Sequence, residues 1–452
     1  MSAFSLISQL NLEKINQKVI LAVWIIDINK QGNSLWFITS QDSSSYIQIV
    51  VKNKELISRL KERSKGDLLE VQGIVKKKVP EKGKENSEEE LEIELTEFQL
   101  INANSSNKDL PFPFVNVKED NKYRYRYLDL RNPSSKKMLL IKNQFCYELR
   151  KFFHEREFVD IETPTLANSS PEGAKCFVVP SNLKNRYYTL PQSAQIFKQL
   201  LMVSGFDKYY QIAKSFRNED ARSNRQTEFS QLELEMSFTT SQQIRQLIEE
   251  MLETVLRNVF GYQIKIPFPT LTYREVMKKY GTDKPDLCSK LKNEKKLKFL
   301  WITDWPLFEY NKESKKYETA RHPFTIPQEK YIKPLLANQI KPEKVICEAF
   351  DLVCNGEEIL SGGMRIHQAE LQAKVLEILG YSKKEQAENF GYFLQALEFA
   401  APPHGGIGLG IDRLLAVILN TNNLKELIAF PKNIDGTCSL TGTPNLIKFP
   451  PK

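Results

Sequence analysis

Residues 216–235, F-R-N-E-D-A-R-S-N-R-Q-T-E-F-S-Q-L-E-L-E, constrain the fold more than any other part of the sequence. Apolar and polar residues alternate in the run that leads into this segment, and that run ends with Arg217 and Glu219. After a polar loop, Gln231, Glu233 and Glu235 alternate with leucine. Since successive side chains of a strand point to opposite faces, the pattern predicts a β-hairpin. One face is apolar, and we expect the other, strongly charged face to be turned towards solvent.

A second segment, G-L-G-I-D-R at 408–413, predicts a binding site for an anion. Its glycines permit close approach of another backbone, and Arg413 falls in the first turn of an apolar helix. The positive end of a helix disfavours a cation there unless an anion, such as phosphate, lies between them. Solvated salt bridges at a sheet edge would explain either segment alone equally well, but the two segments together favour the anion site.

Length and composition indicate a protein of more than one domain. A chain of 452 residues exceeds the size at which a single core keeps growing, and its net charge of +8 permits a polyanionic partner. The six cysteines are scattered without a C-x-x-C pair, and the chain has only four histidines, so structural zinc and disulfides are not expected. The sequence shows neither a signal peptide nor an apolar run of membrane-spanning length. We therefore expect a cytoplasmic protein with no membrane partner.

Short strands separated by turn residues characterise the N-terminal part of the chain. Five strands with one helix after the third predict a small Greek-key barrel of the OB type. The predicted strands are 18–26, 35–39, 46–51, 67–75 and 91–100, and the predicted helix is 54–62. We expect this domain to span 1–105, a linker that ends in K-Y-R-Y-R-Y-L-D-L-R-N-P to span 106–133, and a larger domain to span 134–452.

The larger domain contains a clear hairpin signal at Asn355-Gly356, a dipeptide that favours two-residue β-turns. If these residues form the turn, Val353 pairs with Glu358. The carboxylates of Asp351 and Glu358 then lie on one face as diagonal neighbours, where they suit a hard cation such as Mg²⁺. An ordinary pair of solvent-facing carboxylates would show the same spacing.

Several motifs resemble those of class II aminoacyl-tRNA synthetases, in particular bacterial-type aspartyl-tRNA synthetases. F-R-x-E with a downstream E-F, and G-x-G-x-D-R near the C-terminus, are similar to class II motifs 2 and 3. The resemblance covers nearly the whole chain through further segments: T-P-x-L at 163–166, S-S-P-E-G-A at 169–174, L-P-Q-S-A-Q-I-F-K-Q at 190–199, R-Q-T-E-F at 225–229, Y-G-T-D-K-P-D-L at 280–287, H-P-F-T at 322–325 and A-P-P-H-G-G at 401–406.

The resemblance implies an α+β fold: an N-terminal OB-fold β-barrel that binds the anticodon, and a class II catalytic domain with an antiparallel sheet flanked by helices. Residues 288–299 stand where bacterial relatives carry an inserted domain, so most of that insertion is expected to be missing. An amphipathic helix from Ser134 and a strand that ends at Pro164 match motif 1 and imply a homodimer. An ordinary core helix would have the same periodicity.

The implied reaction joins L-aspartate to ATP and then transfers it to the 3′ end of tRNA(Asp). Because the attacking group is already a carboxylate, the site needs cations and metal ligands rather than a general base. For Phe229, a place in the core is the plainer alternative. The resemblance assigns catalysis to Arg217 and Arg413, ATP binding to Arg217, Glu219, Gln226, Phe229, Glu358 and Arg413, and Mg²⁺ to Asp351, Glu358 and Ser361.

Specificity for aspartate requires a fixed positive pocket, which the resemblance places at Lys198 and Arg365. An asparagine side chain would leave both cations unpaired, at a cost of several kcal/mol. The family usually has aspartate where Glu233 stands, and Arg321 replaces a histidine that often precedes H-P-F-T. His404, in a loop that the sequence suggests is flexible, could be a structural residue. The other expected aspartate contacts are Glu172, Ser193, Gln195, Arg217, Gln231, Glu233 and His322.

Four residues are expected to contact tRNA: Phe37 and Gln48 on the barrel, and Arg222 and Arg225 in the hairpin loop. A core aromatic, a surface amide and solvated arginines are the plainer alternatives. The arginine-rich turn of the family reads D-I-N-K-Q-G-N-S here, which leaves open whether tRNA(Asn) is also a substrate. An asparaginyl-tRNA synthetase, disfavoured by Lys198, and a tRNA-binding paralogue without catalysis, disfavoured by the intact charges, are the remaining alternatives.

Overall fold

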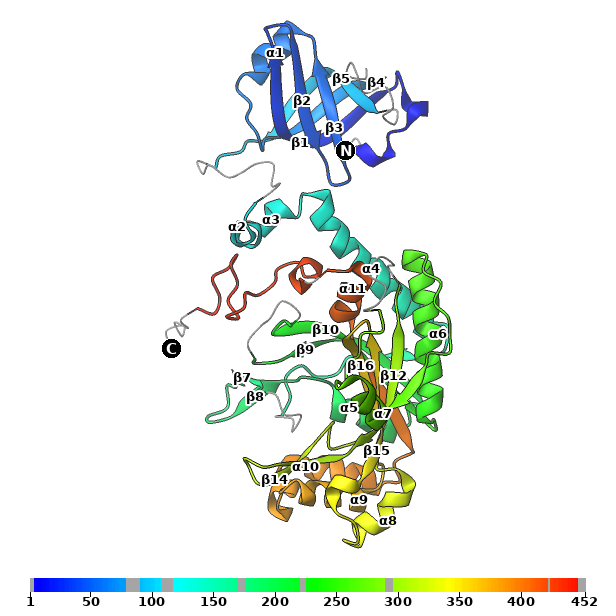
Figure 1. Ribbon diagram of the computed structural model, residues 1–452. Helices are drawn as coiled ribbons and strands as arrows, with labels where there is room; N and C mark the ends of the chain where they lie inside the picture. The colour runs from blue at the N-terminus through cyan, green and yellow to red at the C-terminus, as the bar shows by residue number, and fades with distance from the viewer. Residues whose placement is uncertain are drawn as a thin grey trace. The chain divides into compact units, whose positions relative to one another are not determined.

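The computed structural model describes residues 4–78, 90–106, 117–168, 175–219, 225–288, 296–421 and 423–445. The chain divides into two compact units, Met1–Lys137 and Met138–Lys452 (Figure 1). Two expected site residues, Glu172 and Arg222, lie outside the described residues, as does most of the segment 288–299. Across the described ranges, every helix is too short or too polar to span a membrane.

A closed five-stranded barrel with strand order β1-β2-β3-β5-β4 forms most of the first unit and confirms the predicted OB-type fold. Leu21, Val23 and Ile25 alternate into its core. β1 is longer than predicted because a bulge after Ile25 interrupts the alternation, and the strand then continues along β2. The elements are η1 (Ile7–Gln9), η2 (Leu12–Lys14), β1 (Lys18–Gln31), β2 (Leu35–Gln41), β3 (Tyr46–Val51), α1 (Lys54–Leu60), β4 (Leu68–Lys77) and β5 (Leu91–Asn102).

The basic aromatic run that the sequence places in a linker is helical. It forms α2 (Glu119–Arg124) and α3 (Arg126–Asp129), which belong to the first unit. Arg126 and Asp129 form a buried ion pair at helical spacing, and the guanidinium of Arg126 lies 5.4 Å from the ring centre of Tyr123. These contacts explain why a segment without an apolar stripe adopts local helical structure.

An eight-stranded sheet with order β11-β12-β15-β16-β17-β10-β9-β6 forms the centre of the second unit. Its inner pairs are antiparallel, as predicted, whereas β11 and β6 at the two edges pair in parallel with their neighbours. The strands of the second unit are β6 (Val159–Asp160), β7 (Phe177–Pro180), β8 (Tyr187–Leu190), β9 (Lys208–Phe216), β10 (Glu228–Ser237), β11 (Thr270–Thr272), β12 (Phe299–Pro306), β13 (Phe308–Asn311), β14 (Lys316–Thr319), β15 (Ile346–Cys354), β16 (Glu357–Met364) and β17 (His404–Gly410). Of these, β7 with β8 and β13 with β14 form two separate two-stranded sheets.

Helices cover both faces of this sheet. Apolar side chains of α4, α6 and α11 pack with Leu232 and Leu234 of β10 on one face of the sheet. α5 lies on the opposite face of the sheet, where it contacts β10. α6 begins at a capping box formed by Thr240 and Gln243. The helices are α4 (Pro133–His154), α5 (Gln195–Val203), α6 (Ser241–Phe260), α7 (Tyr273–Tyr280), α8 (Glu329–Leu336), η3 (Pro342–Lys344), α9 (Ala369–Ile378), α10 (Lys383–Glu398), α11 (Ile411–Leu419) and η4 (Leu424–Leu427).

Candidate functional site

The predicted hairpin of β9 and β10 is present, and β17 pairs with the other edge of β10. Glu233 lies opposite Gly408, and Glu235 lies opposite Gly406. A Cβ atom on Gly406 would lie 2.2 Å from Oε2 of Glu235. Glycine is therefore required at this position, because the carboxylate of Glu235 occupies the space above the neighbouring strand.

The expectation that the charged face of β10 is turned towards solvent is wrong. Glu233 and Glu235 are fully buried, and Lys198 and Arg365 are each only 1% exposed. α5 covers this face and places Lys198 over β10, where its Nζ lies 2.9 Å from Oε2 of Glu233 and 3.3 Å from Oε2 of Glu235. Two cations opposite two carboxylates make burial of four charged groups possible.

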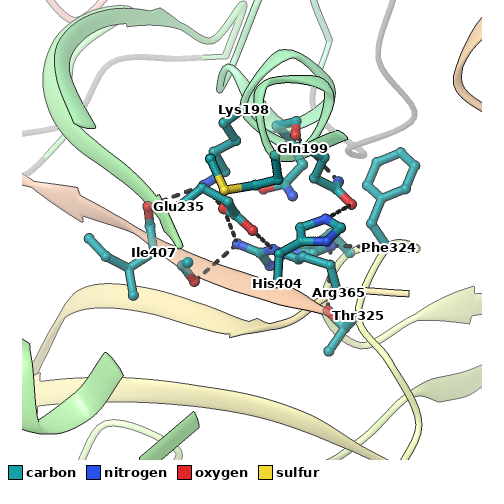
Figure 2. Close-up of polar contacts among 12 residues, drawn as sticks. Lys198, Gln199, Glu235, Phe324, Thr325, Arg365, His404 and Ile407 are labelled. Carbon is teal, nitrogen blue, oxygen red and sulfur yellow. Dashed lines mark hydrogen bonds and ion pairs between the residues drawn. The ribbon is translucent and has the colours of Figure 1, made fainter. Parts of the chain in front are cut away.

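Arg365 completes this group from the other side of Glu235 (Figure 2). Its Nε donates to Oε1 of Glu235 at 2.9 Å, and its Nη2 donates to the Gly406 carbonyl at 3.0 Å. Burial by itself would raise the pKa of Glu235, but the charges of Arg365 and Lys198 outweigh it and hold this pKa below its ordinary value. Glu235 is therefore an anion at neutral pH that joins both cations.

Two histidines lie near this group: His404 is buried and His322 is half-buried. Burial and the charge of Arg365 hold the pKa of His322 well below its ordinary value, and Nη1 of Arg365 contacts its Nε2. His404 is the first residue of β17 and is fully buried, so the expectation of a flexible loop is wrong there. Its Nδ1 donates to the Pro402 carbonyl at 2.7 Å, and its Nε2 lies 3.2 Å from Oε1 of Gln199 (Figure 2).

An open cavity, with about 770 Å³ of free space including the solvent at its mouth, lies beside the buried charges. Gln231 and Gly408, which lie on the same face of the sheet as Glu233, form part of its wall. The cavity brings together all six residues expected to bind ATP, including both predicted catalytic arginines. Its lining includes Arg217, Glu219, Arg225, Gln226, Phe229, Gln231, Glu358, Ser361 and Arg413.

The two arginines approach this cavity from different elements. Arg217 follows β9, and its guanidinium carbon lies 5.1 Å from the ring centre of Phe229. Arg413 lies in the first turn of α11 and donates from Nη1 to the Glu358 carbonyl at 2.6 Å. Burial and the positive charge of Arg413 lower the pKa of Arg217. The two guanidinium groups repel each other across the cavity, and an anion bound between them would remove this repulsion.

The predicted hairpin at Asn355-Gly356 is confirmed, with Val353 opposite Glu358. A bulge in β16 then moves Asp351 opposite Ser361, one position further than a regular register gives. Both carboxylates have protein cations as partners, because Arg321 pairs with Asp351 and Lys284 Nζ lies 3.3 Å from Oε2 of Glu358. Burial raises the pKa of Asp351, although the charge of Arg321 opposes that shift.

Unpartnered polar atoms gather around these groups. Among the described residues, buried nitrogen and oxygen atoms without a hydrogen-bond partner are rare, and each calls for an explanation. Six of these nine atoms belong to the cavity lining, the buried charges, α5 or the Arg321–Asp351 pair: Gln195 Nε2, Arg217 Nε, Gln226 Nε2, Glu233 Oε1, Arg321 Nε and Asp351 Oδ1.

The remaining expected contacts are distributed over both units. Ser193 is half-buried just before α5, and Arg225 is exposed, with Nη1 3.6 Å from Oε2 of Glu219. On the barrel, Phe37 and Gln48 are half-buried diagonal neighbours on β2 and β3, since Gln48 lies opposite Thr39. Gln48 donates from Nε2 to Glu92 at 3.1 Å.

Reasoning from the sequence left three residues of this region without a role. Glu235 was visible as the third member of the charged strand face, and Gln199 follows Lys198 at helical spacing from Gln195. Arg321 was expected to add charge, but its partner Asp351 lies thirty positions away in the sequence. Such a pairing has no local signal, because it depends on how the loop before His322 returns to the sheet.

Two family models match this chain. The description of the first is "tRNA synthetases class II (D, K and N)", and it matches residues 118–434. The second describes an OB-fold nucleic acid binding domain and matches residues 19–101. Together they account for both units.

Individual relatives agree with this result. The aspartate–tRNA(Asp/Asn) ligase of Dictyoglomus turgidum is 35% identical, over 97% of this chain and 95% of its own. The aspartate–tRNA ligase of Staphylococcus aureus is 33% identical, over 95% of each chain. The D. turgidum alignment spans 566 positions, more than the 452 residues of this chain, so the relative has segments without a counterpart here.

Solved structures show the same fold. Asparaginyl-tRNA synthetase from Pyrococcus horikoshii, complexed with asparaginyl-adenylate, superposes with a TM-score of 0.75 at 21% identity, over 95% of this chain and 98% of its own. A putative aspartyl-tRNA synthetase from Leishmania major gives a TM-score of 0.73 at 18% identity, over 95% and 93% of the two chains.

The charge balance around Glu235 predicts a pH-dependent stability difference for Glu235→Gln. At neutral pH the variant should lose about 3–5 kcal/mol of unfolding free energy, because Lys198 and Arg365 lose a shared anion. Since the folded pKa of Glu235 is below its ordinary value of 4.5, wild type has this contribution above that pH and loses it as pH falls through the folded pKa.

Urea unfolding of both proteins from about pH 7 to about pH 3.5 measures this difference. The difference in unfolding free energy between wild type and Glu235→Gln should be constant above the ordinary glutamate pKa and should become smaller below it. Glu228→Gln, on the same strand but half-exposed and paired with Lys432 at 3.1 Å, is the matched control and should show little gap at any pH. A gap that widens in acid would contradict the assigned charge state.

Proposed function

This chain belongs to the class II tRNA synthetases of the aspartate, lysine and asparagine group and is an aspartate–tRNA ligase, and from this premise we propose that the cavity binds ATP and the buried charges bind aspartate. The observation that carries the proposal is the pair of fully buried cations, Lys198 and Arg365, next to a cavity with two arginines. A buried guanidinium and ammonium provide what a carboxylate side chain needs and what an amide cannot neutralise.

The cavity suits a nucleotide because it combines an aromatic surface with cations. Phe229 stacks on one side of the adenine ring, Arg413 covers the other side, and Glu219 and Gln226 form its polar edge contacts. Arg217 bridges the α-phosphate and the α-carboxylate of aspartate. Its Nε has no partner in the protein, so the nucleotide gains this donor without breaking an existing bond.

Charge neutralisation and positioning supply the rate of the first step. The aspartate carboxylate attacks the α-phosphorus as pyrophosphate leaves, and Arg217 stabilises the negative charge that accumulates on the phosphoryl oxygens. No proton has to be removed from the nucleophile. Arg413, at the other end of the cavity, holds the departing phosphates. Transfer of the aspartyl group from the adenylate to the terminal ribose of tRNA(Asp), with release of AMP, then completes the reaction.

Mg²⁺ fits the carboxylates of β15 and β16. Oδ1 of Asp351 is buried without a partner, Ser361 lies opposite Asp351 on the neighbouring strand, and Ser361 and Glu358 both line the cavity. No cluster of three His, Cys, Asp or Glu side chains that could hold a metal occurs within the described ranges, and a site of two carboxylates completed by phosphate oxygens is typical of Mg²⁺. The ion, when bound there, neutralises phosphate charge.

The aspartate pocket lies under α5. Lys198 and Arg365 hold the side-chain carboxylate, while Glu233 and Gln195 face the ammonium group. Gln231, whose Oε1 accepts from Ser215 at 3.1 Å, extends the polar surface from this pocket to the cavity, and Glu172, Ser193 and His322 are the remaining contacts. His322 is neutral, so it adds no charge to a pocket that selects by charge.

We further propose that tRNA(Asp) contacts the barrel at Phe37 and Gln48 and the catalytic domain at Arg222 and Arg225, and that tRNA(Asn) is a second substrate. The β1–β2 turn offers one cation, Lys30, and its ammonium lies 4.6 Å from the ring centre of Trp36. A turn without arginine lacks the forked donor that reads a base edge, so discrimination at the anticodon is weak.

We also propose a cytoplasmic homodimer. α4 keeps Leu140 and Tyr147 more than half exposed although its other side is in the core, and β6 is an edge strand with Val159 exposed. Apolar side chains beside an uncovered strand edge are the surface that a second copy can cover. The six cysteines have free thiols, as suits a reducing compartment.

Lys198→Leu tests the two halves of the site separately. Aspartate-dependent ATP–pyrophosphate exchange should show the KM for aspartate rising at least about 100-fold, because a carboxylate loses a buried cation. ATP affinity, measured by equilibrium dialysis, should change less than about threefold. Arg413→Lys is the matched change in the cavity and should have the opposite pattern. Equal losses for both substrates, or exchange that prefers asparagine, would contradict the assignment.

Transcripts of tRNA that differ only in the third anticodon base test tRNA selection. We expect kcat/KM for aspartylation of the two to differ by less than about tenfold, because one good base contact supplies about 1–3 kcal/mol of discrimination and the turn lacks the arginine for it. Gln31→Arg, adjacent to Lys30, should increase the preference. A wild-type preference above about 1,000-fold would show that this barrel discriminates by other residues.

Sedimentation velocity at micromolar concentration should show a dimer. Leu140→Glu should shift it to monomer, because a charge would be buried in the interface. Phe399→Ser, at a highly exposed position after α10, should leave the dimer intact. Wild type that sediments only as monomer would refute the dimer.

A further inference from the structure

Glu233 is already paired with Lys198, the cation that is proposed to bind the side-chain carboxylate of aspartate. Its Oε2 lies 2.9 Å from Nζ of Lys198, and both side chains are almost completely buried. Glu235 joins Lys198 to Arg365, so two carboxylates balance two cations before aspartate enters. A third carboxylate placed at Lys198 would lie against Glu233 in a medium of low dielectric, where like charges repel strongly.

The other oxygen of Glu233 has no partner. Oε1 is buried and accepts no hydrogen bond, which is costly for a carboxylate. On the β17 side, Gly408 lies opposite, and a Cβ there would be 2.6 Å from Nε2 of Gln231 and 3.7 Å from Oε1 of Glu233, so the Gln231 amide occupies the space beside this oxygen. Glu233 therefore has an electrostatic reason to move away from Lys198, and the flexible Gln231 side chain is the group that has to give way.

We propose that Glu233 is a specificity-determining stand-in for the substrate: its carboxylate holds Lys198 until the side-chain carboxylate of aspartate displaces it, and the ammonium group of the same molecule then receives it. The inference rests on the proposed function of Lys198. The exchange keeps every charge paired, because one incoming carboxylate replaces Glu233 and one incoming ammonium re-pairs it.

This exchange selects for two groups at once. Asparagine brings the ammonium but leaves Lys198 with only the carboxylate of Glu235, which it shares with Arg365, when Glu233 turns away. Succinate, which is aspartate without the ammonium, displaces Glu233 but leaves that carboxylate buried and unpaired. A fixed ion pair that took no part in binding would impose neither penalty, so the two views differ in what happens to succinate.

The variant Glu233→Gln distinguishes the proposed exchange from a fixed ion pair. Isothermal titration calorimetry of the full-length protein with L-aspartate and with succinate gives the ratio of the two dissociation constants. The variant should bind aspartate at least about tenfold more weakly, and succinate at least about tenfold more tightly, than wild type, since no anion competes for Lys198 and no ammonium is required. Binding of ATP reports that the variant is folded.

Glu228→Gln, on the exposed end of the same strand, is the matched control and should leave the ratio unchanged. Glu233→Asp, which keeps the charge, should retain the wild-type preference for aspartate, and it decides the matter if Glu233→Gln does not fold: a preference lost in Glu233→Asp would overturn the inference. Equal weakening of both ligands in Glu233→Gln would also overturn it. Wild type that binds no aspartate would instead refute the proposed function.

Discussion

Four charged side chains buried between β10, α5 and β16 form the interaction on which the rest of the site depends. Each ion alone would pay a large desolvation penalty, and only the alternation of Lys198, Glu233, Glu235 and Arg365 makes their burial tolerable. Removal of one member leaves an uncompensated charge, whereas replacement of all four by apolar residues would cost nothing comparable. The arrangement is therefore a weak source of stability, and it fits the proposed role in which two buried cations distinguish a carboxylate from an amide.

Strand β17 makes this arrangement possible because two of its residues have no side chain. Gly406 and Gly408 lie opposite the two glutamates, so long side chains can lie flat over the backbone of their neighbour. On the other face of the same strands, Leu232 and Leu234 face Leu409 and Ile407 in the core. One alternating pattern thus builds an apolar core on one face of the sheet and a charged pocket on the other.

Sequence patterns of short range predicted most of the fold. The alternation in β9 and β10, the helix after G-L-G-I-D-R, the barrel strands and the Asn355-Gly356 turn each have a local signal, and each is confirmed. Burial of the charged face and the Arg321–Asp351 pair were not predictable, because both depend on which distant element packs against the sheet. Hydrophobic patterning treats a glutamate as exposed, and it cannot register a cation delivered by a helix elsewhere in the chain.

The site is also incompletely satisfied, and this incompleteness is itself informative. Unpartnered donors and acceptors on Arg217, Gln226, Gln195 and Asp351 each cost stability in a protein whose total margin is small. These four lie on or next to the sheet of the second unit, whereas Ser40 of the barrel and Gln372 of α9 are examples elsewhere among the described residues. A ligand that supplies phosphate oxygens, an adenine ring and an ammonium group would satisfy donors and acceptors together. Under the proposed function, the polar atoms that folding leaves unpaired are the ones that ATP and aspartate would pair.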